Sequence, residues 1–384
     1  MNILSIETSC DETAVSVLTA EGEKEHPTFR VLGDALYSQA SKHAAYGGVY
    51  PTLAKREHQK NLVPLTHEAL SEADLLEKGE TVVPENSLEH AREDEFKQDV
   101  SSFLRNTQKP NLDCIAVTHG PGLEPALWTG VAFANILGSV WNIPVIGINH
   151  MEGHILSAVA QKNETGFSVP QPTFPMVSLL ISGGHTELVA MNDWFVYELI
   201  GRTRDDAVGE AFDKVARLLN YPYPGGPAID QAAERSRERG ENPHIELPRP
   251  MLNDGSCDFS FSGLKTAVLY LIRDQENIDE QLREDIANEF TQAVREVLVQ
   301  KTKRALEQTG ARTLVVGGGV SASTYLREGI ESLVETHSDV TLHYPEKGMT
   351  GDNAVMIGIA AYLRHVHGYT SQKPVTAKGS LSLA

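Results

Sequence analysis

The sequence has few cysteines, no long apolar run and too little positive charge to balance its acids. Cys10, Cys114 and Cys257 lie far apart, which excludes a CxxC zinc knuckle and argues against a disulfide scaffold. The longest apolar candidate, residues 129–141, is shorter than the ~18 residues of a membrane span and contains Gly138. The start "MNILSIETSC" has neither the basic nor the apolar region of a secretory signal. We therefore expect a cytoplasmic protein without a membrane partner.

The charge balance bears on possible nucleic-acid partners. The chain has 384 residues, 52 of them acidic and 33 basic, and a formal net charge of −19. Because phosphate neutralisation needs clustered lysine and arginine, this balance alone disfavours binding to nucleic acid. A chain this acidic would hold RNA only through a local basic patch or with a basic partner.

Short apolar runs alternate with helical patterns, which predicts an α/β fold. Residues 1–18 and 174–191 share one pattern, in which two apolar runs flank a small polar turn. Such a repeat suggests two lobes of similar build, although two unrelated hairpins would give the same pattern. Further strands are predicted at 114–118, 144–148, 313–317 and 340–344, and helices at 123–141, 206–220, 283–309 and 352–366.

Two segments lack this alternation of short apolar runs and helical patterns. Residues 77–105 are rich in charge and have little apolar periodicity, so we expect a solvated surface insertion rather than a binding element. Residues 370–384 are expected to form a mobile tail.

A histidine pair is the first candidate for chemistry. His150 and His154 lie four residues apart, so on a helix they share a face and could bind one metal ion. Glu152 would lie about 200° from the first histidine around that helix. It therefore cannot serve as the general base of the zinc-protease motif, in which the glutamate follows the first histidine directly. The same pair could equally be core or surface histidines.

A third ligand could come from anywhere in the chain. Asp352 directly precedes the apolar helical pattern of 352–366 and is one candidate. An aspartate at this place is also an ordinary helix N-cap, whose side chain accepts backbone N–H groups. The sequence alone leaves both readings open.

Glycine-rich turns suggest a second kind of site. Residues 314–323 combine a strand, three glycines and the start of a helix, where exposed N–H groups and the helix dipole suit an anion such as phosphate. Residues 179–188 and 221–230 add Gly-Gly turns, and residues 9–13 form a polar turn. Together they favour a nucleotide-binding cleft between lobes, although glycine pairs make tight turns routinely.

An acidic helix start follows at residues 203–219. Asp206 is expected to cap this helix. Asp213 follows an apolar pair and is expected near the core, where it could bind a ligand hydroxyl. A salt bridge from Asp213 to Lys214 or Arg217 is the alternative.

These motifs together resemble the TsaD family, the tRNA N6-adenosine threonylcarbamoyltransferases of the actin-like, sugar-kinase and Hsp70 superfold (ASKHA). The resemblance covers nearly the whole chain and fails only at the 77–105 insertion and the tail. The matching segments are 6–17, 43–58, 118–127, 149–157, 180–188, 205–219, 223–230, 259–268, 317–323 and 351–358.

The resemblance implies a two-lobed actin-like ATPase fold with a nucleotide cleft between the lobes. It implies an N-terminal lobe at 1–148, with the insertion at about 77–105, and a C-terminal lobe at 149–351. The C-terminal helix and tail at 352–384 would pack back on the N-terminal lobe.

The resemblance also implies the site residues. His150, His154 and Asp352 would bind one divalent metal ion, either iron or zinc, with iron the first choice. Ser323 stands where the family usually has asparagine, which puts a contact to adenine or ribose at this position in doubt. Threonylcarbamoyl-AMP or ATP would be bound by Leu180, Ile181, Ser182, Gly183, Gly184, Asp213, Gly226, Asp230 and Ser323.

The implied reaction is transfer of the threonylcarbamoyl group from threonylcarbamoyl-AMP to N6 of adenosine 37 in tRNAs that read ANN codons, with release of AMP. Asp11 and Glu12, in the first hairpin turn, are our catalytic candidates for orienting the attacking amine. The implied partners are tRNA, an inactive paralogue of the same fold and a P-loop ATPase. A metal-dependent peptidase and an inactive nucleotide-binding partner of the same superfold are the alternative functions.

Overall fold

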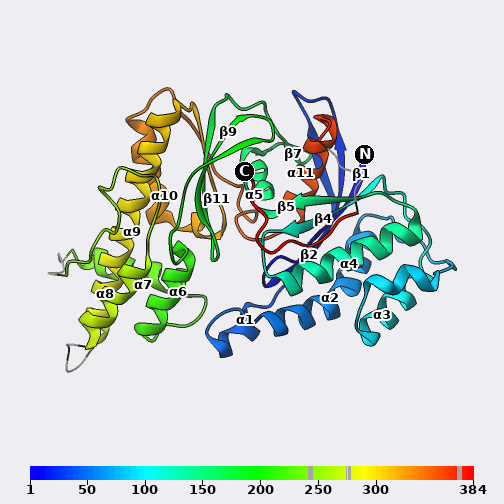
Figure 1. The fold of residues 1–384 in the computed structure, drawn as a ribbon, viewed down its shortest axis with the longest axis horizontal. Coiled ribbons are helices and arrows are strands. Elements are labelled where there is room, and N and C mark those ends of the chain that lie inside the picture. Colours follow the sequence, from blue (N-terminus) through cyan, green and yellow to red (C-terminus); the bar gives the residue numbers. More distant parts are fainter. Residues whose placement is uncertain (241–244, 274, 276–277, 370–373) are drawn as a thin grey trace. The chain divides into compact units, whose positions relative to one another are not determined.

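Figure 1 shows the fold in a computed structural model, which describes residues 1–240, 245–273, 275, 278–369 and 374–384. The chain divides into two compact units. The first unit comprises Met1–Ala40, Val49–Gln171 and Pro345–Leu383, and the second comprises Ser41–Gly48, Pro172–Tyr344 and Ala384. These limits differ from the expected boundaries at 148 and 351, because helix α5 (His150–Val159) contacts elements of the first unit. The assignment of the lobes stays a prediction.

The first unit is built on a seven-stranded sheet in the order β5-β4-β1-β2-β3-β7-β6. β1 pairs antiparallel with β2 and parallel with β4, and β4 pairs parallel with β5. Alternate side chains of β1 face opposite sides of the sheet, as the twofold period of a strand requires. The strands are β1 (Asn2–Glu7), β2 (Glu12–Glu21), β3 (Thr28–Ser38), β4 (Cys114–Gly120), β5 (Val145–Asn149), β6 (Gln161–Lys162) and β7 (Phe167–Ser168).

The second unit repeats this plan in a five-stranded sheet of order β10-β9-β8-β11-β12. β8 and β9 form an antiparallel hairpin, while β8, β11 and β12 run parallel. Strand order and directions match those of β3-β2-β1-β4-β5, so the predicted repeat of two hairpins is confirmed, and the fold is the duplicated α/β plan of the actin-like class. The strands are β8 (Met176–Ile181), β9 (Thr186–Asp193), β10 (Val196–Arg202), β11 (Thr313–Gly317) and β12 (Thr341–His343).

Helices cover both faces of the first sheet. Leu4 and Ile6 of β1 belong to the hydrophobic core that α2, α3 and α4 complete. Ser5 lies on the opposite face, where α11 approaches so closely that a Cβ at Gly358 would lie 3.2 Å from the Ser5 hydroxyl. The helices are α2 (Pro51–Glu72), η2 (Glu85–His90), α3 (Asp94–Arg105), α4 (Glu124–Trp141), α5 and α11 (Ala354–Val366).

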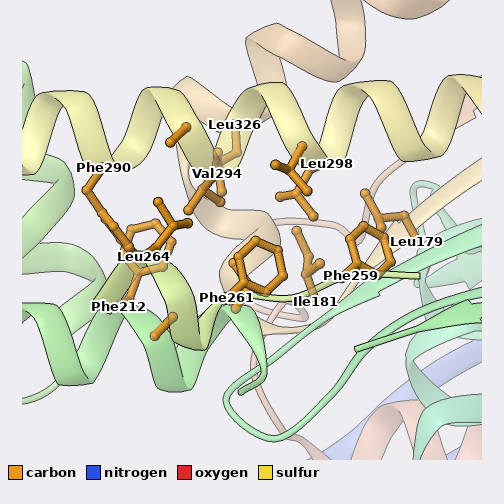
Figure 2. Close-up of a cluster of buried hydrophobic side chains, with 14 of the residues drawn as sticks. Leu179, Ile181, Phe212, Phe259, Phe261, Leu264, Phe290, Val294, Leu298 and Leu326 are labelled. Atoms are coloured by element: carbon orange, nitrogen blue, oxygen red, sulfur yellow. The ribbon is translucent and has the colours of Figure 1, made fainter. Parts of the chain in front are cut away.

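The core of the second unit lies between its sheet and the long helix α9 (Glu280–Thr309). Figure 2 shows Phe290, Val294 and Leu298 of this helix beside the side chains of β8 and α6. The apolar stripe of 283–309 is therefore core, as its 3.6-residue period indicates. The remaining helices are α1 (Ala40–His43), η1 (Ala44–Tyr46), α6 (Val208–Leu218), α7 (Gly225–Arg239), α8 (Ser262–Arg273), η3 (Gly319–Ala322) and α10 (Thr324–Glu335).

The expectation of a merely solvated insertion at 77–105 is wrong for its second half. Residues 94–105 form the amphipathic helix α3, whose buried side chains are Phe96, Val100, Phe103 and Leu104. The ring of Phe96 packs against Phe133 of α4, with 6.1 Å between centroids. The four residues recur at helical spacing, so one face of α3 joins the core although the other face is charged.

The expectation of a mobile tail is wrong for residues 374–384, and residues 370–373 lie outside the described part of the chain. Val375 and Ala377 are buried, and the N–H of Lys378 donates to the carbonyl of His119 at 2.8 Å. A Cβ at Gly120 would lie 2.1 Å from the Lys378 carbonyl. The glycine therefore makes room for the tail, which lies across the end of β4.

Replacement of Phe96 tests the role of α3 in the core. We expect Phe96→Ala to lower the free energy of unfolding by about 3 kcal/mol, because the ring is almost fully buried and leaves a cavity. The matched control is Gln98→Ala on the exposed face of the same helix, which should change stability by no more than about 0.5 kcal/mol. Urea unfolding of both variants measures the difference. Equal effects would show that α3 does not contribute to the core.

Candidate metal centre and active site

Helix α5 begins at the carboxyl end of β5, and this junction places the histidines. Asn149 ends the strand and caps the helix, because its side-chain oxygen accepts the N–H of Met151 at 2.9 Å. The helix therefore starts at His150 itself. Gly153 faces α11, where a Cβ would lie 3.1 Å from Met356 and Ile357. This close approach brings the segment before α11 to the histidines.

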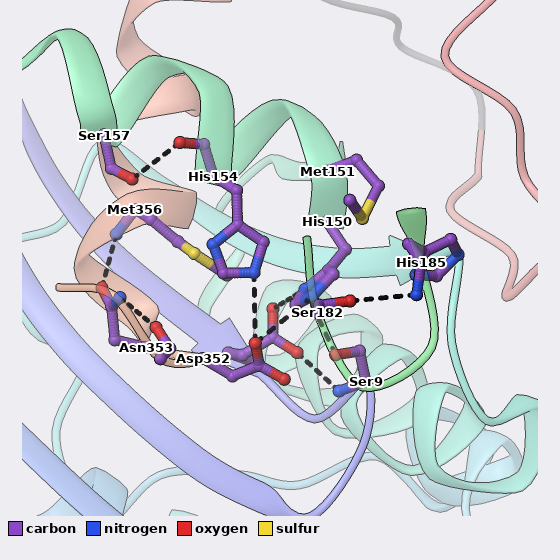
Figure 3. A network of polar contacts seen from close by, with 12 residues as sticks. Ser9, His150, Met151, His154, Ser157, Ser182, His185, Asp352, Asn353 and Met356 are labelled. Carbon is purple, nitrogen blue, oxygen red and sulfur yellow. Dashed lines mark hydrogen bonds and ion pairs between the residues drawn. The ribbon is translucent and has the colours of Figure 1, made fainter. Parts of the chain in front are cut away.

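Three side chains of the first unit converge at this point (Figure 3). Asp352 Oδ1 lies 3.4 Å from His150 Nε2 and 3.2 Å from His154 Nε2. One ligand atom from each of the three residues lies within 4.8 Å of the others. Both histidines are buried and Asp352 is nearly so. The predicted convergence of these three residues is therefore present.

Asp352 does not cap α11. Asn353 occupies the N-cap position, and its side-chain oxygen accepts the N–H of Met356 at 2.9 Å. The capping alternative for Asp352 is therefore wrong, and its carboxylate is left to face the two imidazoles.

The donor set fits a divalent transition metal. His150 Nδ1 lies 3.1 Å from Glu7 Oε2 and 3.2 Å from Ser9 Oγ. Because a carboxylate can only accept, Nδ1 keeps its proton, and Nε2, which faces Asp352, is the nitrogen that would bind a metal ion in place of a proton. Two imidazole nitrogens and one carboxylate oxygen suit iron or zinc, with coordination positions left over. Burial opposes protonation of His150, but Asp352 and Glu7 outweigh it and raise the pKa of His150 well above its ordinary value.

Glu152 is directed to another partner. Its side chain is fully buried, and Arg364 Nη2 donates to Glu152 Oε2 at 2.7 Å. This pairing agrees with the predicted orientation of Glu152 and leaves the zinc-protease motif without its general base.

The turn between β1 and β2 carries Asp11 and Glu12. Ser38 Oγ donates to Glu12 Oε1 at 3.0 Å. Burial, together with the charges of Asp352 and Asp11, raises the pKa of Glu12 to about 9. The turn is thus electrostatically coupled to the His-His-Asp group, while a catalytic role for Asp11 and Glu12 stays a prediction.

The second unit holds the predicted nucleotide residues. Leu180 and Ile181 are buried in β8, and the turn of Ser182, Gly183 and Gly184 follows directly. A Cβ at either glycine would meet nothing within 4 Å. The backbone of this turn is therefore open to a ligand.

Asp213 and Asp206 differ in role. Asp213 Oδ1 accepts the N–H of Gly225 at 2.7 Å and so holds the start of α7. Asp206 pairs with Lys214 at 2.7 Å instead of capping α6, whose N-cap is Ala207. The predicted cap at Asp206 is wrong, because Thr186 Oγ1 accepts the N–H of Val208 in its place.

Asp230, Ser323 and Gly226 complete the predicted set. Asp230 Oδ1 is buried and has no hydrogen-bond partner among the described residues. Burial raises the pKa of Asp230, although the hydroxyl of Ser323 hydrogen-bonds the carboxylate and opposes the shift. Ser323 also caps α10, accepting the N–H of Leu326 at 3.4 Å. A Cβ at Gly226 would meet nothing within 4 Å.

Sequence reasoning missed the buried polar residues at His150, namely Glu7, Ser9 and Thr118. A usable signal existed for Glu7, the one charged residue of a short strand that is otherwise uncharged. Buried carboxylates are rare unless they are paired. Ser9 and Thr118 carry no comparable signal, because uncharged hydroxyl residues are common at strand ends and turns.

The chain is similar to known proteins over nearly its whole length. The family model described as "TsaD: tRNA N6-adenosine threonylcarbamoyltransferase" matches residues 30–83 and 82–359. The chain is 42% identical over 369 residues to the protein of that name from Chromobacterium violaceum, covering 95% of this chain and 93% of the relative. It is 42% identical over 364 residues to the one from Nitrosospira multiformis, covering 95% and 91%. The solved ROK hexokinase from Thermus thermophilus is 12% identical with a TM-score of 0.46, covering 96% of this chain and all of that one.

The duplicated α/β plan and the buried His-His-Asp group define the class as an α/β protein whose first unit carries residues that fit a metal ion. Within that class, the chain belongs to the TsaD family of tRNA N6-adenosine threonylcarbamoyltransferases. In the part of the chain that the structure describes, no helix is both long and apolar enough to cross a membrane.

The raised pKa of Glu12 predicts a pH-dependent stability. Between its ordinary pKa of 4.5 and about 9, the folded chain holds a proton that the unfolded chain releases. The contribution of this group to stability therefore falls as the pH rises through that window. We expect the metal-free Glu12→Gln variant to unfold at a higher temperature than wild type at pH 8, with the difference shrinking towards pH 5.

Thermal unfolding in chelator across pH 5 to 8 measures this effect. Glu25→Gln, at an exposed position, is the control and should show no such trend. A difference between Glu12→Gln and wild type that does not vary with pH would contradict the raised pKa.

Proposed function

We propose that this chain transfers the threonylcarbamoyl group from threonylcarbamoyl-AMP to N6 of adenosine 37 in tRNAs that read ANN codons. The observation that carries the proposal is the convergence of His150, His154 and Asp352 in a chain of this family. These three residues would hold one divalent ion, iron first and zinc second. When bound, the ion would polarise the carbonyl or hold the adenylate.

The second unit supplies the proposed nucleotide site. The open backbone of Gly183 and Gly184 suits phosphate or carbonyl oxygens, because exposed N–H groups bind anions. Asp230 Oδ1 lacks a partner among the described residues and could accept a ribose hydroxyl. The side chain of Ser323 is shorter than asparagine and hydrogen-bonds to the carboxylate of Asp230. Ser323 would therefore orient Asp230 and would not contact the adenine directly.

The transfer forms a bond from N6 to the carbamoyl carbon and breaks the bond from that carbon to the phosphate oxygen of AMP. The exocyclic amine is a weak nucleophile, so positioning and stabilisation of oxygen charge must lower the barrier. Asp11 and Glu12 would orient the amine, and the carboxylate of Asp11 would take up the proton that the amine loses, because Glu12 already holds a proton at neutral pH. No covalent enzyme intermediate is needed.

The resemblance to the family implies the proposed partners, and the net charge of −19 supports a tRNA surface that the chain shares with them. Lys55 pairs with Glu93, and Arg204 pairs with Asp258, so these two cations are already neutralised within the chain. A tRNA surface shared with an inactive paralogue and a P-loop ATPase in the cytoplasm would supply the missing positive charge.

Reconstitution tests the proposed function. The purified chain and its partner proteins receive threonylcarbamoyl-AMP and unmodified tRNA, and the nucleosides are analysed by mass spectrometry. We expect wild type to form the threonylcarbamoylated adenosine and His150→Ala to form it at least about tenfold more slowly, because a metal ligand is lost.

The matched control is His67→Ala, which removes an exposed histidine of α2 and should react at the wild-type rate. Modification by His150→Ala at the wild-type rate would exclude the metal centre from the reaction. Absence of the modified nucleoside with wild type would overturn the proposed reaction itself.

A further inference from the structure

We propose that Glu7 is a positioning residue that fixes the tautomer and orientation of His150 for metal binding. This inference rests on the proposed metal centre and adds a residue that is not itself a ligand. Glu7 is the last residue of β1 and is fully buried. A carboxylate at such a place is costly unless each oxygen finds a donor.

Both oxygens of Glu7 do find donors. Oε1 accepts the N–H of Ser9 at 2.5 Å. Oε2 accepts the hydroxyl of Thr118 at 2.5 Å and faces His150 Nδ1 at 3.1 Å. The carboxylate is thereby anchored by its own chain segment and by β4, and its remaining lone pair is directed at the imidazole of α5.

This arrangement decides which ring nitrogen of His150 binds the ion. A carboxylate can only accept, so Nδ1 must keep its proton, and Nε2 is the nitrogen that supplies a lone pair to an ion once it gives up its own proton. Nε2 is the nitrogen that faces Asp352, at 3.4 Å. Glu7 lies on the Nδ1 side of the ring, away from that lone pair, and therefore supports the ligand rather than joining it.

The two histidines are unequal in this respect. His154 Nδ1 is buried and has no hydrogen-bond partner among the described residues, whereas His150 Nδ1 is held by Glu7. Carboxylates that accept from the second nitrogen of a ligating histidine also make the ring a stronger donor. Glu7 should therefore act on metal affinity through His150.

Glutamine cannot replace this carboxylate. The N–H of Ser9 requires an acceptor on one side, and the Nδ1–H of His150 requires one on the other, where the hydroxyl of Thr118 also donates. The amide NH₂ of Glu7→Gln would face one of these donors. Either His150 Nδ1 would lose the oxygen that accepts its proton, or the N–H of Ser9 would lose its acceptor. We expect a metal dissociation constant about 10–100-fold weaker than that of wild type.

The experiment is a titration of the metal-free full chain with zinc and, under anaerobic conditions, with iron(II), followed by metal analysis after dialysis. Glu152→Gln is the matched control, because Glu152 is equally buried on the same helix as His150 but pairs with Arg364. This control should lower the thermal unfolding midpoint and leave the metal dissociation constant within about threefold of wild type.

A second variant keeps the test valid if Glu7→Gln does not fold. Thr118→Val removes only the hydroxyl that anchors Glu7 Oε2, and we expect it to weaken metal binding several-fold. Wild-type affinity in the folded Glu7→Gln chain, or in Thr118→Val where that variant alone folds, would overturn the positioning role while leaving the proposed transfer intact. A wild-type chain that binds neither metal would overturn the metal centre and this role together.

Discussion

The close packing of α5 against α11 is the constraint on which the metal group depends. The contact joins residues 198 positions apart, His154 and Asp352. A Cβ at Gly153 would lie 3.1 Å from side-chain atoms of Met356 and Ile357, so a larger residue there would require these side chains to shift in a densely packed interior. The ligand geometry therefore depends on the packing of the two helices as well as on the ligands themselves.

Buried charge is the second constraint on this site. Glu7 and Asp352 lie beside His150, and burial together with the charges of Asp352 and Asp11 raises the pKa of Glu12 to about 9. Burial, together with the charges of Asp11, Asp352 and Glu12, also raises the pKa of Cys10 well above its ordinary range, so its thiol is a poor nucleophile at neutral pH. A divalent cation would offset this excess of negative charge, which agrees with the chemistry of the donor set.

Periodicity predicted the elements that are long or repeated. The two hairpins and α9 follow from alternation and from a 3.6-residue stripe, since both patterns are local. It failed for α3, whose four apolar residues are embedded in a charged segment, and for residues 374–384. There, burial of Val375 and Ala377 depends on space left by distant residues such as Gly120, which no local pattern can indicate.

The role of Asp352, the residue that faces the two histidines, also could not be predicted from the local sequence pattern. Asp352 and Asn353 are adjacent, and aspartate and asparagine cap helices almost equally well. Only the start of α11, one residue later than an Asp352 cap would require, frees the carboxylate to face the imidazoles. That offset follows from the fit of α11 against the sheet and α5, in which Gly358 lies against Leu18 and Gly153 against Met356. Tertiary packing therefore decides which of two equivalent caps becomes a ligand.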